Sequence, residues 1–85
     1  MPIAVKGERN MSLRREMAKE IKILEEEIRL LEVKRSRSQA ALIEALISKQ
    51  DPDETEIQFF RTYTADIEIK RERLLKLTRQ LEKLV

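Results

Sequence analysis

The tetrapeptide Asp51-Pro52-Asp53-Glu54 separates two long helical patterns. Asp51 is a good N-cap because its carboxylate can accept a hydrogen bond from a free backbone N–H of the helix that follows. Pro52 suits the first helical position, and Glu54 stands three residues after Asp51, which is the spacing of a capping box. Pro52 also keeps residue 51 out of the α-helical conformation, so the preceding helix must end there. The tetrapeptide therefore predicts a turn between two helices.

Apolar residues on both sides of the turn recur at steps of three and four, the heptad pattern of helices that pack side by side. The row before the turn is Met17, Ile21, Leu24, Ile28, Leu31, Arg35, Ser38, Leu42 and Ala45, and the row after it is Phe60, Tyr63, Ile67, Lys70, Leu74, Leu77, Leu81 and Leu84. Folded at the turn, the two rows match without a slip, with pairs such as Leu42/Phe60, Ser38/Tyr63, Leu24/Leu77 and Met17/Leu84. We therefore predict an all-α fold, a two-helix antiparallel coiled-coil hairpin. Its helices are expected at about 12–49 and about 52–84, its turn at about 50–51, and a flexible arm at 1–11.

The composition restricts the possible functions. The 85 residues are 40% charged and 41% hydrophobic with a net charge of +2, a balance typical of long paired helices. The sequence holds no Cys and no His, which removes thiolate sites, the commonest general base and the commonest metal ligand. No apolar run approaches the roughly 18 residues that cross a bilayer. We therefore expect a cytoplasmic protein that is not an enzyme, holds no cofactor or metal and does not enter a membrane.

A second apolar row lies on the first helix, away from the row that faces the second helix. With two residues of the second helix that also lie off the main seam, the predicted interface is Ile23, Leu30, Val33, Ala40, Ile43, Ile47, Phe59 and Ile69. A row of aliphatic side chains along one helix face usually marks an interface. We predict a homodimer in which the first helix packs on its twin in a four-helix bundle. Two alternatives stay open: a monomer that tolerates the exposure, and a surface for a different helical protein.

Basic residues cluster in the middle of the hairpin, where the predicted register brings two basic segments together. This basic belt consists of Lys34, Arg35, Arg37, Lys70, Arg71 and Arg73. A basic surface on a dimeric hairpin can bind RNA through its phosphates. Against this reading, acidic residues interleave with the belt, Asp66 is placed to pair with Arg35, and no aromatic side chain is expected there for base stacking.

Charge is uneven along the hairpin. Residues 44–58 hold five acidic residues and one basic residue, a balance of −4. The open end, residues 1–22 with 76–85, holds nine basic and four acidic residues, a balance of +5. Such polarity can steer an oppositely charged partner or end-to-end stacking, or it can serve only to keep the chain in solution.

Taken together, these patterns favour a non-catalytic protein–protein interaction module that acts through the apolar row of the first helix. An adaptor, a chaperone and a subunit of a larger assembly all fit that description. The alternative is a dimeric helical hairpin that binds RNA through the basic belt.

Overall fold

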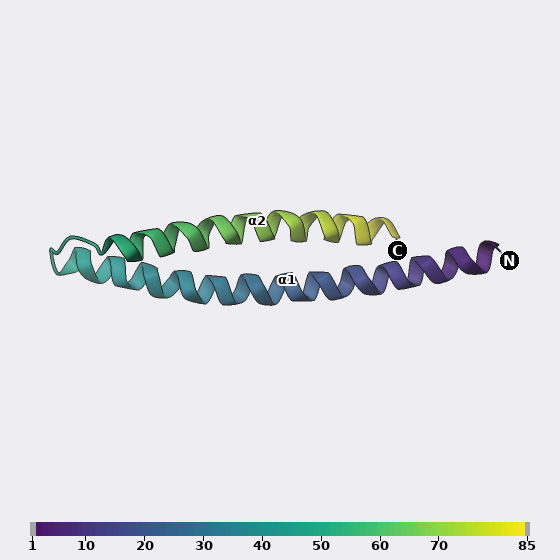
Figure 1. Ribbon diagram of the computed structural model, residues 1–85, viewed down its shortest axis with the longest axis horizontal. Helices are drawn as coiled ribbons and strands as arrows, with labels where there is room; N and C mark the ends of the chain where they lie inside the picture. The colour runs from purple at the N-terminus through teal and green to yellow at the C-terminus, as the bar shows by residue number, and fades with distance from the viewer. Residues whose placement is uncertain (1, 85) are drawn as a thin grey trace.

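Two helices make up the chain in the computed structural model, whose described backbone covers residues 2–84 and whose described side chains cover residues 11–84. Helix α1 is Pro2–Ile47 and helix α2 is Glu54–Leu84. They lie side by side and run in opposite directions (Figure 1), and the Cα atoms extend over 71 × 17 × 14 Å. The predicted all-α hairpin of two packed helices is confirmed.

Helix α1 begins at Pro2 rather than near residue 12, so its backbone includes most of the segment predicted as an arm. Gly7 does not interrupt it, because a single glycine inside a helix costs only about 1 kcal/mol relative to alanine. The flexibility predicted for residues 1–11 stays a prediction, because the side chains of residues 1–10 lie outside the described residues.

Helix α1 closes with a Schellman motif although no glycine stands at its end. Lys49 takes the left-handed conformation, with φ at 57°. The Gln50 N–H donates to the Ala45 carbonyl at 2.9 Å and the Lys49 N–H to the Leu46 carbonyl at 3.2 Å, the two bonds that define the motif. A left-handed non-glycine residue costs about 1–2 kcal/mol, and these bonds offset that cost by satisfying terminal carbonyls. The helix therefore ends at Ile47, earlier than predicted.

The N-cap of α2 is Asp53, and the prediction of Asp51 for this role is wrong. The Asp53 carboxylate accepts a hydrogen bond from the Thr55 N–H at 3.0 Å, and the Asp53 carbonyl accepts one from the Ile57 N–H at 3.1 Å. Glu56 stands three residues after Asp53, so the capping-box spacing occurs twice in this part of the sequence. Asp53 is used instead of Asp51 because the motif that closes α1 takes up Lys49 and Gln50. The chain then needs further residues to cross the roughly 8–10 Å between packed helix axes.

Removing the Asp53 cap is expected to lower the free energy of unfolding by about 0.5–2 kcal/mol in Asp53→Ala. Asp51→Ala is the matched control, since it removes the same group two residues away, and we expect it to change that free energy by less than about 0.5 kcal/mol. Urea denaturation followed by far-ultraviolet circular dichroism measures both variants. A larger loss in Asp51→Ala than in Asp53→Ala would show that Asp51, two residues earlier, caps the helix.

A single apolar seam between α1 and α2 holds the hairpin together. Its buried side chains are Met17, Leu24, Ile28, Ser38 and Ile67, and all of them lie on the predicted rows. The register agrees with the prediction at two points, since Met17 and Leu84 line one hollow at the open end and Ser38 and Tyr63 line another nearer the turn. Two helices can enclose only such a line of side chains, so the remaining faces of both helices stay open to solvent.

One hydroxyl beside the seam is buried without a partner. Thr64 Oγ1 has no hydrogen-bond partner among the described residues, whereas Thr78 Oγ1 donates to the Leu74 carbonyl at 2.8 Å. Thr64→Val keeps the shape and removes the desolvated hydroxyl, so we expect the free energy of unfolding to rise by about 1 kcal/mol. Thr78→Val removes a hydrogen bond that is made, and it should leave that free energy unchanged or lower it. Thermal denaturation of the two variants checks this, and a destabilised Thr64→Val would contradict it.

Candidate interaction surface

The outer face of α1 is an exposed apolar row. We define it by the α1 residues of the predicted interface, all of which are exposed: Ile23, Leu30, Val33, Ala40, Ile43 and Ile47. Ile23 is 57% exposed and Leu30 48% exposed, against 6% for Leu24 in the seam. The contrast between the neighbours Ile23 and Leu24 arises because consecutive helical side chains point about 100° apart. Helix α2 therefore leaves this row open to solvent.

The two α2 residues of the predicted interface are exposed as well, but they belong to the other helix. Ile69 is 65% exposed, and the ring of Phe59 stacks on Tyr63 with the ring centroids 6.0 Å apart. Leu46, which is 67% exposed and follows Ile43 by three residues, was not among the predicted interface residues. Counting neighbours at i+3 and i+4, rather than steps of seven, finds Leu46 and widens the outer face near the turn.

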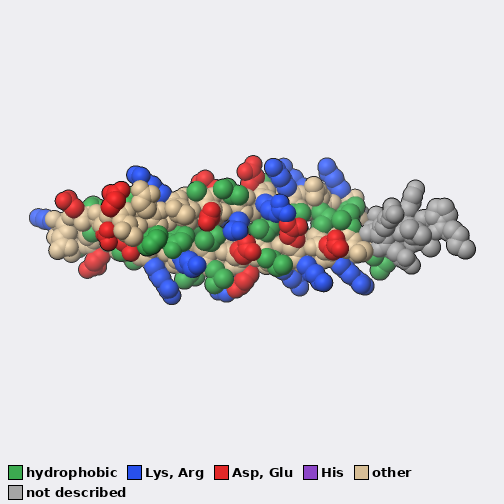
Figure 2. Space-filling model, in the orientation of Figure 1, with side chains coloured by type: hydrophobic (Ala, Val, Ile, Leu, Met, Phe, Trp, Pro, Cys, Tyr) green, Lys and Arg blue, Asp and Glu red, His purple; other side chains and the backbone are tan. Residues whose placement is uncertain are grey.

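Charged side chains interrupt the apolar surface, and Figure 2 shows hydrophobic groups separated by Lys, Arg, Asp and Glu. Glu26 comes between Ile23 and Leu30 in the row, and its carboxylate pairs with the Arg29 guanidinium at 2.6 Å. Hydrogen bonds from Arg29 hold the pKa of Glu26 below its ordinary value, and the same bonds raise the pKa of Arg29. Glu26 is therefore a fixed negative charge on the outer face of α1.

The α2 half of the basic belt is neutralised by carboxylates of α1. Lys70 Nζ lies 2.7 Å from a Glu27 carboxylate oxygen, and Arg71 Nη2 lies 3.3 Å from a Glu32 carboxylate oxygen. Arg73 pairs with Glu20 in the same way. These interhelical ion pairs are half exposed, so each adds little stability. The other three belt members, Lys34, Arg35 and Arg37, form no ion pair with a described residue.

The expected ion pair between Arg35 and Asp66 is not formed within the part of the chain whose side chains are described. Asp66 instead lines a shallow hollow together with Lys34 and Lys70. Consecutive helical residues do not share a face, so a carboxylate placed beside Lys34 is not also beside Arg35. Arg35 stays half-buried over the seam, where its long apolar stem can pack while its charge reaches water.

Aromatic side chains do stand beside the basic belt, contrary to the sequence-based expectation. Lys34 and Arg37 of α1 line a second shallow hollow with Phe59 and Tyr63 of α2. Glu56 lines the same hollow and supplies an opposing negative charge. The predicted register already pairs Tyr63 with Ser38, the residue after Arg37, so the sequence carried a signal for this grouping that was not used.

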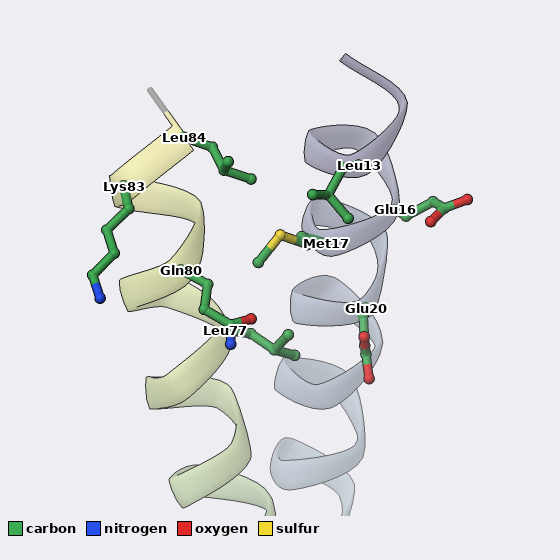
Figure 3. A pocket seen from close by; sticks show the side chains of 8 residues that line it. All are labelled: Leu13, Glu16, Met17, Glu20, Leu77, Gln80, Lys83 and Leu84. Carbon is green, nitrogen blue, oxygen red and sulfur yellow. The ribbon is translucent and has the colours of Figure 1, made fainter. Parts of the chain in front are cut away.

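The seam opens into a third hollow at the open end of the hairpin (Figure 3). Leu13, Met17, Leu77 and Leu84 point into the space between the helices, whereas Glu16 and Lys83 point away from it. The described polar side chains of its lining are Glu16, Glu20, Gln80 and Lys83. Since Glu16 and Lys83 point away, they do not form the convergent set that orients a ligand in a small-molecule site. The hollow is the place where the seam ends and where the facing apolar side chains are only partly covered.

Among residues 11–84, no three acidic side chains come together as a metal site would need. Neither α1 nor α2, over its described length, has a stretch long and apolar enough to cross a lipid bilayer. Compared with known proteins, the chain matches no family model, no curated protein sequence and no solved structure.

Proposed function

We propose that the protein is a non-catalytic interaction module whose outer face of α1 packs against a helix of a partner. The observation that carries this proposal is the row of exposed aliphatic side chains along a helix whose opposite side already holds the seam. An amphipathic helix with a second apolar row is the usual donor for helix-in-groove or helix-on-helix recognition. An adaptor, a chaperone or an assembly subunit in the cytoplasm fits this mode of action.

The surface area of the chain supports a partner. The hairpin exposes 7055 Å², whereas a compact folded monomer of 10.1 kDa exposes about 5,300 Å². The excess of about 1,800 Å² exceeds the roughly 800 Å² that each partner loses in a standard interface. Covering half-exposed side chains such as Leu30 adds about 1 kcal/mol each, so several are needed to exceed the cost of association. The row supplies that number.

Photo-cross-linking tests the proposal directly. We expect a benzophenone amino acid in place of Leu30 to form protein adducts in cells that express the full chain. The same amino acid in place of Leu75, which is 50% exposed on α2, is the matched control and should form few. Equal yields at the two positions would show that the outer face of α1 is no special contact surface.

RNA binding is the second candidate, and one observation favours it. The hollow lined by Lys34, Arg37, Phe59 and Tyr63 combines positive charge with a partly exposed aromatic ring, the pair of features that holds single-stranded bases. The three ion-paired members of the belt weigh against it, because they contribute little attraction for phosphate. Fluorescence anisotropy with an oligouridine decides between the readings. We expect no binding at about 0.15 M salt, and binding that is lost in Phe59→Ala would favour the RNA reading.

A further inference from the structure

We propose that the partner is a second copy of this chain, packed antiparallel so that the two outer faces of α1 meet about a two-fold axis between residues 31 and 32. This inference rests on the proposed function and names its partner. The row along the contact, with the charged residues that interrupt it, reads Lys19, Ile23, Glu26, Leu30, Val33, Arg37, Ala40 and Glu44, and every member is exposed.

The row is complementary to its own reverse. About the proposed axis, Leu30 of one copy lies opposite Val33 of the other, and Ile23 lies opposite Ala40. The charged positions match as well, because Glu26 falls opposite Arg37 and Lys19 falls opposite Glu44. Apolar positions therefore meet apolar ones and each charge meets its opposite. Ile43 lies beside the outermost matched pair, Lys19 with Glu44, and Ile47 lies beyond it, at each end of the contact.

Other pairings of the same surfaces are worse. A parallel dimer in register sets Glu26 against Glu26 and Arg37 against Arg37, and like charges directly opposed disfavour a pairing. An antiparallel dimer shifted by seven residues sets Glu26 against Glu44 and Val33 against Arg37. Of these three arrangements, only the proposed register avoids both opposed like charges and an apolar side chain set against a charged one.

The charge at the two ends of the hairpin favours the same orientation. The turn region, residues 44–58, has a balance of −4, and the open end is positive. An antiparallel dimer centred near residue 31 brings the turn of each copy beside the open end of the other, whereas a parallel dimer brings like ends together. Since the axis also lies near the middle of the two-helix region, the copies overlap over most of their length.

Paired cysteine substitutions test the orientation and the register together. The sequence has no cysteine of its own, so Ile23→Cys and Ala40→Cys each introduce a single thiol. We expect a disulfide-linked dimer when the two variants are mixed and oxidised, and none from either alone, because like positions are about 26 Å apart in the proposed dimer. Cross-linking of Ile23→Cys with itself would show a parallel dimer and overturn the proposal. A dimer that cross-links in neither experiment would overturn the register.

Charge exchange tests the pairing of Glu26 with Arg37. We expect Arg37→Glu and Glu26→Arg each to weaken dimerisation about tenfold, because each opposes like charges at two symmetry-related places. The double variant restores opposite charges and should return within about threefold of wild type. Sedimentation equilibrium measures all four proteins. A double variant no better than the singles would overturn the pairing.

The proposed function and this inference can fail separately. A wild-type chain that sediments at 10.1 kDa even at about 100 µM, far above a specific dissociation constant, overturns the second copy as the partner. Leu30 cross-links to proteins of other mass would then keep the interaction module and give it another partner. Loss of the cross-links at Leu30 as well would remove both.

Discussion

Ile67→Ala is expected to lower the free energy of unfolding by about 2–5 kcal/mol, the largest loss among alanine truncations of the seam residues. Ile67 is the one described side chain that is fully enclosed, at 0% exposure. A chain of this length has a total stability of about 4–13 kcal/mol, so the loss removes a large part of it. Two helices have few neighbouring side chains that can move in to fill the space left by the missing methyl and methylene groups.

Ile69→Ala is the matched control for Ile67→Ala. It makes the same chemical change two residues along α2, at a side chain that is 65% exposed. Since alanine is the better helix former, we expect the stability to stay within about 0.5 kcal/mol or to rise slightly. Urea denaturation followed by circular dichroism compares the two variants. Similar losses from both would mean that the seam does not lie where the buried residues place it.

Much of the fold could be predicted because one geometric condition governs it. Two apolar rows that keep the same register over their whole length allow only one way of closing the hairpin, and the buried residues Leu24, Ile28 and Ile67 all lie on those rows. The ends of the helices could not be predicted as well. Asp51 and Asp53 each have a glutamate three residues later, and local spacing alone cannot choose between them.

The closure of α1 shows a second limit of sequence reasoning. Lys49 takes a conformation that glycine or asparagine normally marks. The hydrogen bonds made by the Lys49 and Gln50 N–H groups determine where α1 ends. No residue type at these positions predicts those bonds.

For the candidate surface, too, one part could be predicted from the sequence and another could not. Exposure of the outer face of α1 followed from helical periodicity, because any residue far from the seam in angle must face outward. The ion pairs did not follow, since long side chains reach several alternative partners: Lys70 and Arg71 found carboxylates on α1, while Asp66 did not pair with Arg35. Ion pairs of this kind differ by less than about 1 kcal/mol, which is too little for a sequence pattern to rank.

The double variant Leu30→Glu/Val33→Glu is expected to convert the proposed dimer into a monomer of the chain mass, 10.1 kDa. In the proposed register these residues face each other across the two-fold axis, so the change places four carboxylates at the centre of the contact. It removes four apolar side chains worth about 1 kcal/mol each and adds like-charge repulsion. Both residues are already exposed, at 48% and 43%, so the hairpin itself should keep its helicity.

Leu75→Glu separates this effect from a general response to added charge. Leu75 is as exposed as Leu30, at 50%, but lies on α2 and outside the proposed contact. Multi-angle light scattering should give a monomer for the double variant and an unchanged dimer for Leu75→Glu, with similar circular dichroism for all. A double variant that stays dimeric would move the interface away from the outer face of α1. If Leu75→Glu is a monomer, α2 takes part in the contact. The exposed α2 residues of the predicted interface, Phe59 and Ile69, would then belong to it.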